Sequence, residues 1–308
     1  MLFFGALHRN EPIKIAENIV RITEAYSTYA YVLRDTTFAD FIKLNRKAAQ
    51  ELDNNGRILQ QRFNCYCFMP HLAWVETDIS DAQERLVDHW YLRESLVVFG
   101  PQVDRLLRDT TIIFAHTNPD GSWAASENLL YLLRYYDHYF SPHLAMIVVE
   151  QGAAPTIDRT ALPGNCKYIF CGNTKAFARD RCFAEGLSQS DPARRRIILS
   201  DSDIYLETLH IRANLRMCER YDCVNGFSRI IDLNAADSGR LRNARTPQGI
   251  DFLKSDADDR GREGFCLFLN REIQEVPGEN SVGAASWLSS LPRHDRVFQS
   301  PNHALRLH

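Results

Sequence analysis

Asp201 and Asp203 stand two residues apart at the end of an apolar run, Ile197–Leu199. In an extended strand, side chains at positions i and i+2 point the same way, so both carboxylates can face one point just beyond the strand. Two like charges repel there unless a cation lies between them. Mg²⁺ and Mn²⁺ take oxygen ligands of this kind, usually together with substrate phosphates. The spacing predicts a divalent metal site, and the alternative is a solvated turn.

Strands that alternate with helices are expected to position this pair. The expected strands are Thr110–Ala115, Leu144–Val149, Lys167–Cys171 and Arg196–Leu199, with helices after Ser126 and over Phe177–Gln189. Such alternation predicts an α/β fold with a mixed, mostly parallel sheet flanked by helices. Ligands of these sheets bind beyond the carboxyl ends of the strands. The residues at those ends are His116, Glu150, Asn173 and Asp201.

The first part of the chain has a different pattern. Ile15, Ile19, Ile22 and Tyr26 recur at helical intervals after Pro12, which suits the first turn of a helix. Two further helices are expected, one over Phe38–Ala48 ending near Asn54-Asn55-Gly56 and one carrying Leu86, Trp90 and Leu92. The sequence therefore predicts a helical N-terminal region of unknown role over residues 1–109 and a second domain over residues 110–308.

Composition limits the classes of function. The chain has 308 residues and a formal net charge of -3, which gives no electrostatic footprint for nucleic acid. None of the eight cysteines forms a Cys-x-x-Cys pair, so free thiols in a reducing compartment are expected. No apolar run reaches the roughly 18 residues that span a bilayer. We expect a cytoplasmic protein without a transmembrane segment. Peripheral membrane association and the oligomeric state stay open.

Two motifs in order suggest a family. The helix Phe177-Ala178-Arg179-Asp180-Arg181-Cys182-Phe183-Ala184-Glu185-Gly186 precedes Ser200-Asp201-Ser202-Asp203-Ile204. Together they resemble the β-1,4-galactosyltransferase-like group of GT-A glycosyltransferases, with Phe177, Arg179 and Gly186 in register. The resemblance runs from about Thr110 to the end. It implies a GT-A (Rossmann-like) fold and transfer of a sugar from a nucleotide-sugar, in that group a UDP-sugar, to a glycan acceptor, for example in surface polysaccharide synthesis.

The chain also departs from that group. The Asn of the group's helix is replaced by Ala184, and the Trp-Gly-Trp-Gly-Gly-Glu-Asp signature has only the poor counterpart Gly278-Glu279-Asn280. In the group this signature supplies acceptor contacts and the catalytic carboxylate. The departures therefore affect the acceptor and the reaction's stereochemistry more than the fold.

The resemblance implies roles for individual residues. For Mn²⁺ or Mg²⁺, Asp203 is the direct ligand, Asp201 contacts the ribose or acts through water, and a third ligand comes from His303 or His308. For an inverting reaction, Glu279 is the catalytic base, with Asp295 and Asp256 behind it. For the nucleotide, the implied contacts are His116, Asn118, Glu150, Phe177 and Arg179.

Structural roles compete with several of these assignments. His116 also suits a buried structural histidine, Glu150 an exposed strand end, and Arg179 an ion pair with Asp180 or Glu185.

Two other functions compete with glycosyl transfer. A nucleotidyltransferase would carry a basic, Gly-rich phosphate loop after its first strand, but Ala115–Gly121 has no Lys or Arg. A catalytically silent glycan-binding or scaffold module would keep the fold without the chemistry, as the weak acceptor signature allows.

Overall fold

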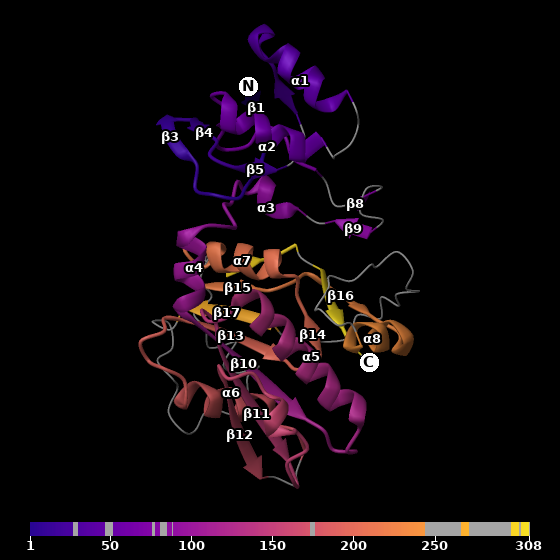
Figure 1. Ribbon diagram of the computed structural model, residues 1–308. Helices are drawn as coiled ribbons and strands as arrows, with labels where there is room; N and C mark the ends of the chain where they lie inside the picture. The colour runs from indigo at the N-terminus through magenta and orange to yellow at the C-terminus, as the bar shows by residue number, and fades with distance from the viewer. Residues whose placement is uncertain are drawn as a thin grey trace. The chain divides into compact units, whose positions relative to one another are not determined.

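The computed structural model describes residues 1–26, 30–46, 52–75, 78–80, 85–87, 89–172, 176–243, 266–270, 297–301 and 303–307 (Figure 1). The chain divides into two compact units, Met1–Asp104 and Arg105–His308. This division lies close to the one expected at residue 109. Of the helices in the described ranges, none combines the length and the apolar character needed to cross a bilayer.

The first unit is built largely from short strands. Its strands are β1 (Leu2–Phe3), β2 (Leu7–His8), β3 (Ile13–Ala16), β4 (Ile19–Arg21), β5 (Ala25–Tyr26), β6 (Tyr31–Val32), β7 (Tyr66–Phe68), β8 (Asp78–Ser80) and β9 (Arg85–Val87). Its helices are α1 (Phe38–Asn45), α2 (Leu52–Arg62), α3 (Trp90–Arg93) and α4 (Pro101–Arg108), the last continuing into the second unit. Within the described residues, five strands form a sheet in the order β3-β4-β7-β1-β6, and β2 pairs with β5.

The first unit was expected to be helical, but among its described residues it combines helices with nine short strands. The residues expected to form its first helix instead make the antiparallel pair β3 and β4. Ile13 and Ile15 are 44% and 55% exposed, while Val20 and Ile22 lie in the core of this unit. Isoleucine favours a strand as readily as a helix when neighbouring strands cover one face, and spacing alone did not distinguish the two.

The other helices expected in this unit were partly right. Helix α1 forms where it was expected, but the residues expected to end it lie inside α2. There the Asn55 amide donates to Asn45 Oδ1 at 2.9 Å, so its polar group is satisfied in the interior. Of the third expected helix, the structure has only α3, preceded by the strand pair β8 and β9.

The second unit contains the expected α/β layers. Its main-sheet strands are β10 (Thr110–Thr117), β11 (Ala145–Gly152), β12 (Cys166–Gly172), β13 (Arg196–Asp201), β15 (Cys223–Asn225), β17 (Cys266–Asn270) and β18 (Val297–Gln299). Within the described residues their order is β12-β11-β10-β13-β17-β15-β18. Strands β10 to β13 are mutually parallel, and β17 is antiparallel to its neighbours. The predicted mixed, mostly parallel sheet is confirmed.

Helices cover both faces of this sheet (Figure 1). The helices of this unit are α5 (Trp123–Phe140), α6 (Arg179–Ser188), α7 (Thr208–Met217) and α8 (Ala235–Arg242), of which α8 packs against α5. Ile113, Val149 and Leu199 share one face and form a core with Cys182 and Phe183 of α6. The alternate residues of the same strands face the opposite side of the sheet. There Phe114 stacks on Tyr136 of α5 with ring centroids 6.1 Å apart. Continuous apolar strands are typical of a sheet buried on both faces.

Gly186 sets the distance between α6 and the sheet. A Cβ at this position would lie 2.4 Å from Ile113 Cγ2 and 3.2 Å from Val149 Cγ2. No side chain fits in that space, so the helix backbone packs directly on β10 and β11. Because Arg179 is the first residue of the same helix, this contact also fixes where the arginine stands.

A small second sheet follows the aspartate pair. Its strands are β14 (Ile204–Tyr205), β16 (Arg229–Asp232) and β19 (His303–Arg306), in the order β14-β19-β16 within the described residues. Arg306 pairs with Ile204 on one side and with Asp232 on the other. The loop expected over Ala235–Arg262 begins instead with α8, and residues 244–262 lie outside the described ranges.

Candidate functional site

The strand ends expected to meet do meet at one edge of the main sheet. His116 of β10 pairs with Glu150 of β11, and Ala115 pairs with Asp201 of β13. Alternation along the strands then divides their side chains between the two faces. Asp201 belongs to the α6 face, as Leu199 does, while His116 and Glu150 belong to the α5 face, as Phe114 does. The edge thus has two sets of polar side chains rather than a single cluster.

Arg179 makes an ion pair with the first aspartate. Its Nε lies 3.0 Å from Asp201 Oδ1, and the two side chains are 35% and 13% exposed. This partner differs from Asp180 and Glu185, the two that the sequence suggested. The Arg179 guanidinium therefore lies directly beside the first carboxylate of the acidic pair. An arginine in this position offers a planar, permanently charged donor for phosphate oxygens.

A second arginine, Arg306, lies at ion-pair distance from the second aspartate, Asp203. Arg306 Nε lies 3.8 Å from Asp203 Oδ2, and Arg306 Nη1 lies 3.5 Å from Asp232 Oδ1. The Leu307 amide also donates to the Asp203 carbonyl at 3.0 Å. Strand β19 therefore brings a guanidinium to Asp203, and the same guanidinium lies beside Asp232 of β16. Sequence reasoning missed both residues because they are remote in the chain from Asp203.

Gln151 holds the segment that leads into α6. Its side chain accepts from the Ala178 amide at 3.0 Å and donates to the Ala176 carbonyl at 3.1 Å. The residue is buried on the α6 face. It thereby fixes the backbone that carries Phe177, whose ring is 38% exposed, and Arg179. A glutamine at a strand end gives no distinctive sequence signal, so its role appears only in three dimensions.

His116 links the two sides of the edge. The residue is fully buried, and its Nδ1 lies 2.9 Å from Ser202 Oγ, between the two aspartates. Burial lowers the pKa of His116 to about 4, although the nearby Glu150 carboxylate acts in the opposite direction. At neutral pH the ring is therefore uncharged. A neutral imidazole here orients the Ser202 turn and so acts as a positioning group.

Glu150 is engaged by neighbouring loops. It accepts from the Thr156 amide at 2.7 Å and the Thr156 hydroxyl at 2.6 Å, and the Tyr168 hydroxyl donates to its other oxygen. Only 1% of Glu150 is exposed. These bonds tie the segment after β11 to β12. The expected nucleotide contact from Glu150 would have to share a carboxylate that already accepts three hydrogen bonds.

Asn118 organises the turn between β10 and α5. Its amide donates to the Ser122 carbonyl at 2.9 Å and to Ser126 Oγ at 3.1 Å, and its oxygen accepts from the Ser122 amide at 2.8 Å.

The backbone of His303 lies in β19, beside Arg229 of β16. The remaining expected site residues, Asn173, Asp256, Glu279, Asp295 and His308, lie outside the described ranges.

A scan of protein-family models finds no match to this chain, and a search of curated proteins finds none either. A search of solved structures does find similar chains. One is glucosyl-3-phosphoglycerate synthase from Mycobacterium tuberculosis in complex with Mn²⁺, UDP and phosphoglyceric acid. It is 12% identical, the match covers 67% of this chain and 73% of that one, and the TM-score is 0.40.

Two further matches have related descriptions. A candidate nucleotide-diphospho-sugar transferase from Desulfovibrio desulfuricans is 10% identical over 65% of this chain and 82% of its own, with a TM-score of 0.37. 4-Diphosphocytidyl-2C-methyl-D-erythritol synthase from Anaerococcus prevotii is 12% identical over 65% and 89%, with a TM-score of 0.40.

The donor set at the edge fits a hard divalent cation. Asp201, Asp203 and Asp232 supply carboxylate oxygens, the ligands that Mg²⁺ and Mn²⁺ prefer. In the described part of the chain they do not form a cluster of three ligand groups within 4.8 Å of one another. Instead Arg179 and Arg306 balance their charge. A cation bound here would therefore bind alongside the arginines or displace them, and substrate phosphates would complete its coordination.

Proposed function

We propose that the protein is a metal-dependent glycosyltransferase that moves a sugar from a nucleotide-sugar to a glycan acceptor. The observation that carries the proposal is the end of β13, where Asp201 and Asp203 lie at the carboxyl edge of a parallel sheet beside Arg179. This edge is where α/β sheets bind ligands. The resemblance to the β-1,4-galactosyltransferase-like group supports a UDP-sugar as donor.

The residues have distinct parts in this proposal. Asp203, the more exposed of the pair at 41%, is the direct ligand of Mn²⁺ or Mg²⁺, and Asp201 contacts the ribose or binds the ion through water. When bound, the ion supplies Lewis-acid stabilisation of the diphosphate leaving group. Arg179 binds phosphate through its guanidinium, and Gln151 and Gly186 keep it in place. The acceptor's proton requires a base, for which Glu279 stays our candidate if the reaction inverts configuration.

Donor hydrolysis and transfer tested with a panel of nucleotide-sugars, UDP-sugars first, check the proposal. Activity should require Mn²⁺ or Mg²⁺ and fall at least about 100-fold in Asp203→Asn, as expected when a group that stabilises the developing charge is removed. Asp191→Asn is the matched control, because Asp191 is an exposed aspartate in the turn before the same strand. Full activity of Asp203→Asn without metal would reject the mechanism.

One observation favours a second function, a catalytically silent scaffold or glycan-binding module. Both aspartates of the pair already have an arginine at ion-pair distance, so the charges are balanced without a metal. Calorimetry with UDP and Mn²⁺ separates the two functions. Heat of binding that depends on both components favours the transferase, and no nucleotide binding favours the scaffold.

We also propose a cytoplasmic location. All eight cysteines are free thiols, as expected in a reducing compartment.

A further inference from the structure

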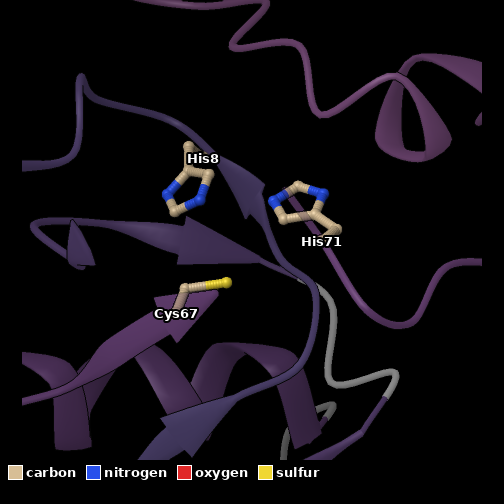
Figure 2. A group of neighbouring side chains, drawn as sticks. All are labelled: His8, Cys67 and His71. Carbon is tan, nitrogen blue, oxygen red and sulfur yellow. The ribbon is translucent and has the colours of Figure 1, made fainter. Parts of the chain in front are cut away.

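Three buried side chains that carry metal-ligand atoms lie close together in the first unit. They are remote in sequence from Asp201 and Asp203, and their ligand atoms are nitrogen and sulfur rather than oxygen. They are His8 of β2, Cys67 of β7 and His71 in the segment after it, and their ligand atoms all lie within 4.8 Å of one another. Figure 2 shows the Cys67 sulfur directed toward the space between the two imidazole rings. The rings are stacked, with centroids 5.6 Å apart and an angle of 26° between their planes.

The imidazole nitrogens of this cluster lack the partners that a buried histidine normally has. His8 is 1% exposed, and neither of its ring nitrogens has a hydrogen-bond partner among the described residues. His71 is 4% exposed, and its Nε2 is without a partner in the same sense. Buried polar groups in native proteins are nearly always paired. Three such nitrogens within one cluster give it the capacity to bind a ligand that accepts imidazole lone pairs.

The surroundings of His71 fix which nitrogen can coordinate a metal. Its Nδ1 lies 2.9 Å from the Leu92 carbonyl oxygen. A carbonyl only accepts, so Nδ1 carries the proton and Nε2 carries the lone pair. The His71 amide also donates to Ser95 Oγ at 2.7 Å. Metal-bound histidines typically have this arrangement, in which a backbone carbonyl or carboxylate holds the nitrogen that does not bind.

The donor set identifies the class of ion. Two imidazoles and one thiol suit a borderline-soft transition metal and not Mg²⁺, Ca²⁺ or Mn²⁺, which prefer oxygen. In a tetrahedral zinc site, bonds of about 2.0–2.3 Å place neighbouring ligand atoms roughly 3.5 Å apart. The ligand atoms of the cluster, all within 4.8 Å of one another, are close to that spacing. The Cys67 thiol, which now lies 3.4 Å from the Phe68 carbonyl oxygen, would lose its proton on binding.

We propose that His8, Cys67 and His71 bind Zn²⁺ in the first unit, with the fourth position of the tetrahedron taken by water or a small ligand. The ion would join β2 near the start of the chain to β7 and to the segment held by Ser95. Strand β2 has two residues and β7 has three, and within the described residues they belong to different sheets. The site does not depend on the proposed glycosyltransferase function.

Zinc binding to the full-length protein, stripped beforehand with a chelator, tests the proposal. We expect one Zn²⁺ per chain at the cluster and a rise in the melting temperature. Replacing zinc by Co²⁺ should give a thiolate-to-cobalt charge-transfer band. Cys67→Ser should abolish the band and weaken binding by more than the roughly 10–100-fold cost of losing an outer-shell partner.

Cys65→Ser is the matched control, because Cys65 is equally buried, lies two residues away in the same core and is not part of the cluster. If Cys67→Ser does not fold, His8→Gln replaces it, with zinc affinity as the readout. Three results would overturn the proposal: no charge-transfer band in the wild-type protein, equal loss of the band in Cys65→Ser, or unchanged zinc affinity in His8→Gln. Since Mn²⁺-dependent turnover reports on Asp203 and not on Cys67, failure of either proposal is recognised separately.

Discussion

Two regions contain side chains that can bind metal ions, and they differ in whether the ligand groups already have partners. At the end of β13, partly exposed aspartates are balanced by Arg179 and Arg306. In the cluster of His8, Cys67 and His71, buried imidazoles have ring nitrogens without a partner in the described structure. In the first region the arginines already compensate the aspartates, so a metal ion would compete with a guanidinium for the carboxylates. The second leaves donors unsatisfied, which favours a tightly held, softer ion.

The largest effect is expected from removing the arginine that balances the strand-end carboxylates. Arg306→Met should lower the free energy of unfolding by about 3 kcal/mol, because it removes the guanidinium that lies 3.5 Å from the largely buried Asp232 carboxylate. The same change should tighten Mn²⁺ binding, since a cation would no longer compete with the guanidinium. Chemical denaturation and calorimetry measure the two effects.

Arg216→Met is the control for this prediction. Arg216 has a similarly low exposure of 16%, but its ion pair joins Glu219 three residues on, and such local pairs contribute only about 0.3–0.5 kcal/mol. Equal losses of stability in the two variants would show that Arg306 does not balance the site. Weaker Mn²⁺ binding in Arg306→Met would remove the contrast between the two regions.

A smaller effect is expected when α6 is pushed off the sheet. Gly186→Ala places a methyl group against Ile113 and should cost about 1–3 kcal/mol of stability, as overpacked cores do. Because α6 carries Arg179, nucleotide affinity should fall as well, while zinc binding in the first unit should not change. Gly164→Ala is the control, since a Cβ there meets no atom within 4 Å. An unchanged melting temperature would contradict the packing argument.

The smallest effect concerns acid, and it compares buried histidines of the two regions. Burial lowers the pKa of His116 to about 4 and that of His8 to about 3, from the ordinary histidine value of about 6.5. Between pH 6.5 and 4 these two imidazoles become protonated in the unfolded chain but stay neutral in the folded chain. The free energy of unfolding therefore decreases as the pH falls through this window. By about pH 5.5, His116 alone should cost about 1 kcal/mol.

Denaturation curves at a series of pH values test this. His116→Asn should make the pH dependence shallower between pH 6.5 and 4, and His138→Asn, which alters an exposed histidine, should not. Added Zn²⁺ should steepen the loss of stability at low pH, since protons then compete with the ion for His8 and Cys67. Identical slopes in His116→Asn and the wild-type protein would contradict the burial argument.

The fold of the second unit could be predicted from the sequence because its signals are local. Strands β10, β11 and β13 are continuous apolar runs, as parallel strands buried on both faces require, and α5 and α6 follow at the expected intervals. The first unit could not be predicted in this way. Its strands are two to four residues long, too short for a periodic pattern, and the isoleucines of β3 and β4 recur at helical spacing.

The candidate site divides along the same line. Asp201 and Asp203 are near neighbours in sequence, so their spacing was informative. Arg306, Asp232 and Gln151 act through contacts between strands far apart in the chain. The cluster of His8, Cys67 and His71 joins strands of two different sheets that are about 60 residues apart in the chain. No short sequence motif predicts such a contact. Local chemistry could be inferred from the sequence, whereas the partners that balance it required three-dimensional structure.

Asp201 and His116 lie on opposite faces of the sheet, and this limits which insertions and deletions β13 can accept during evolution. Deleting or inserting one residue within β13 would preserve many backbone hydrogen bonds by sliding the register, yet it would exchange the two sides of the strand. Asp201 would then turn toward α5, and Arg179 would lose its partner. Length changes in this strand are therefore tolerable only in pairs, whereas the turn around Gly164 is free of that constraint.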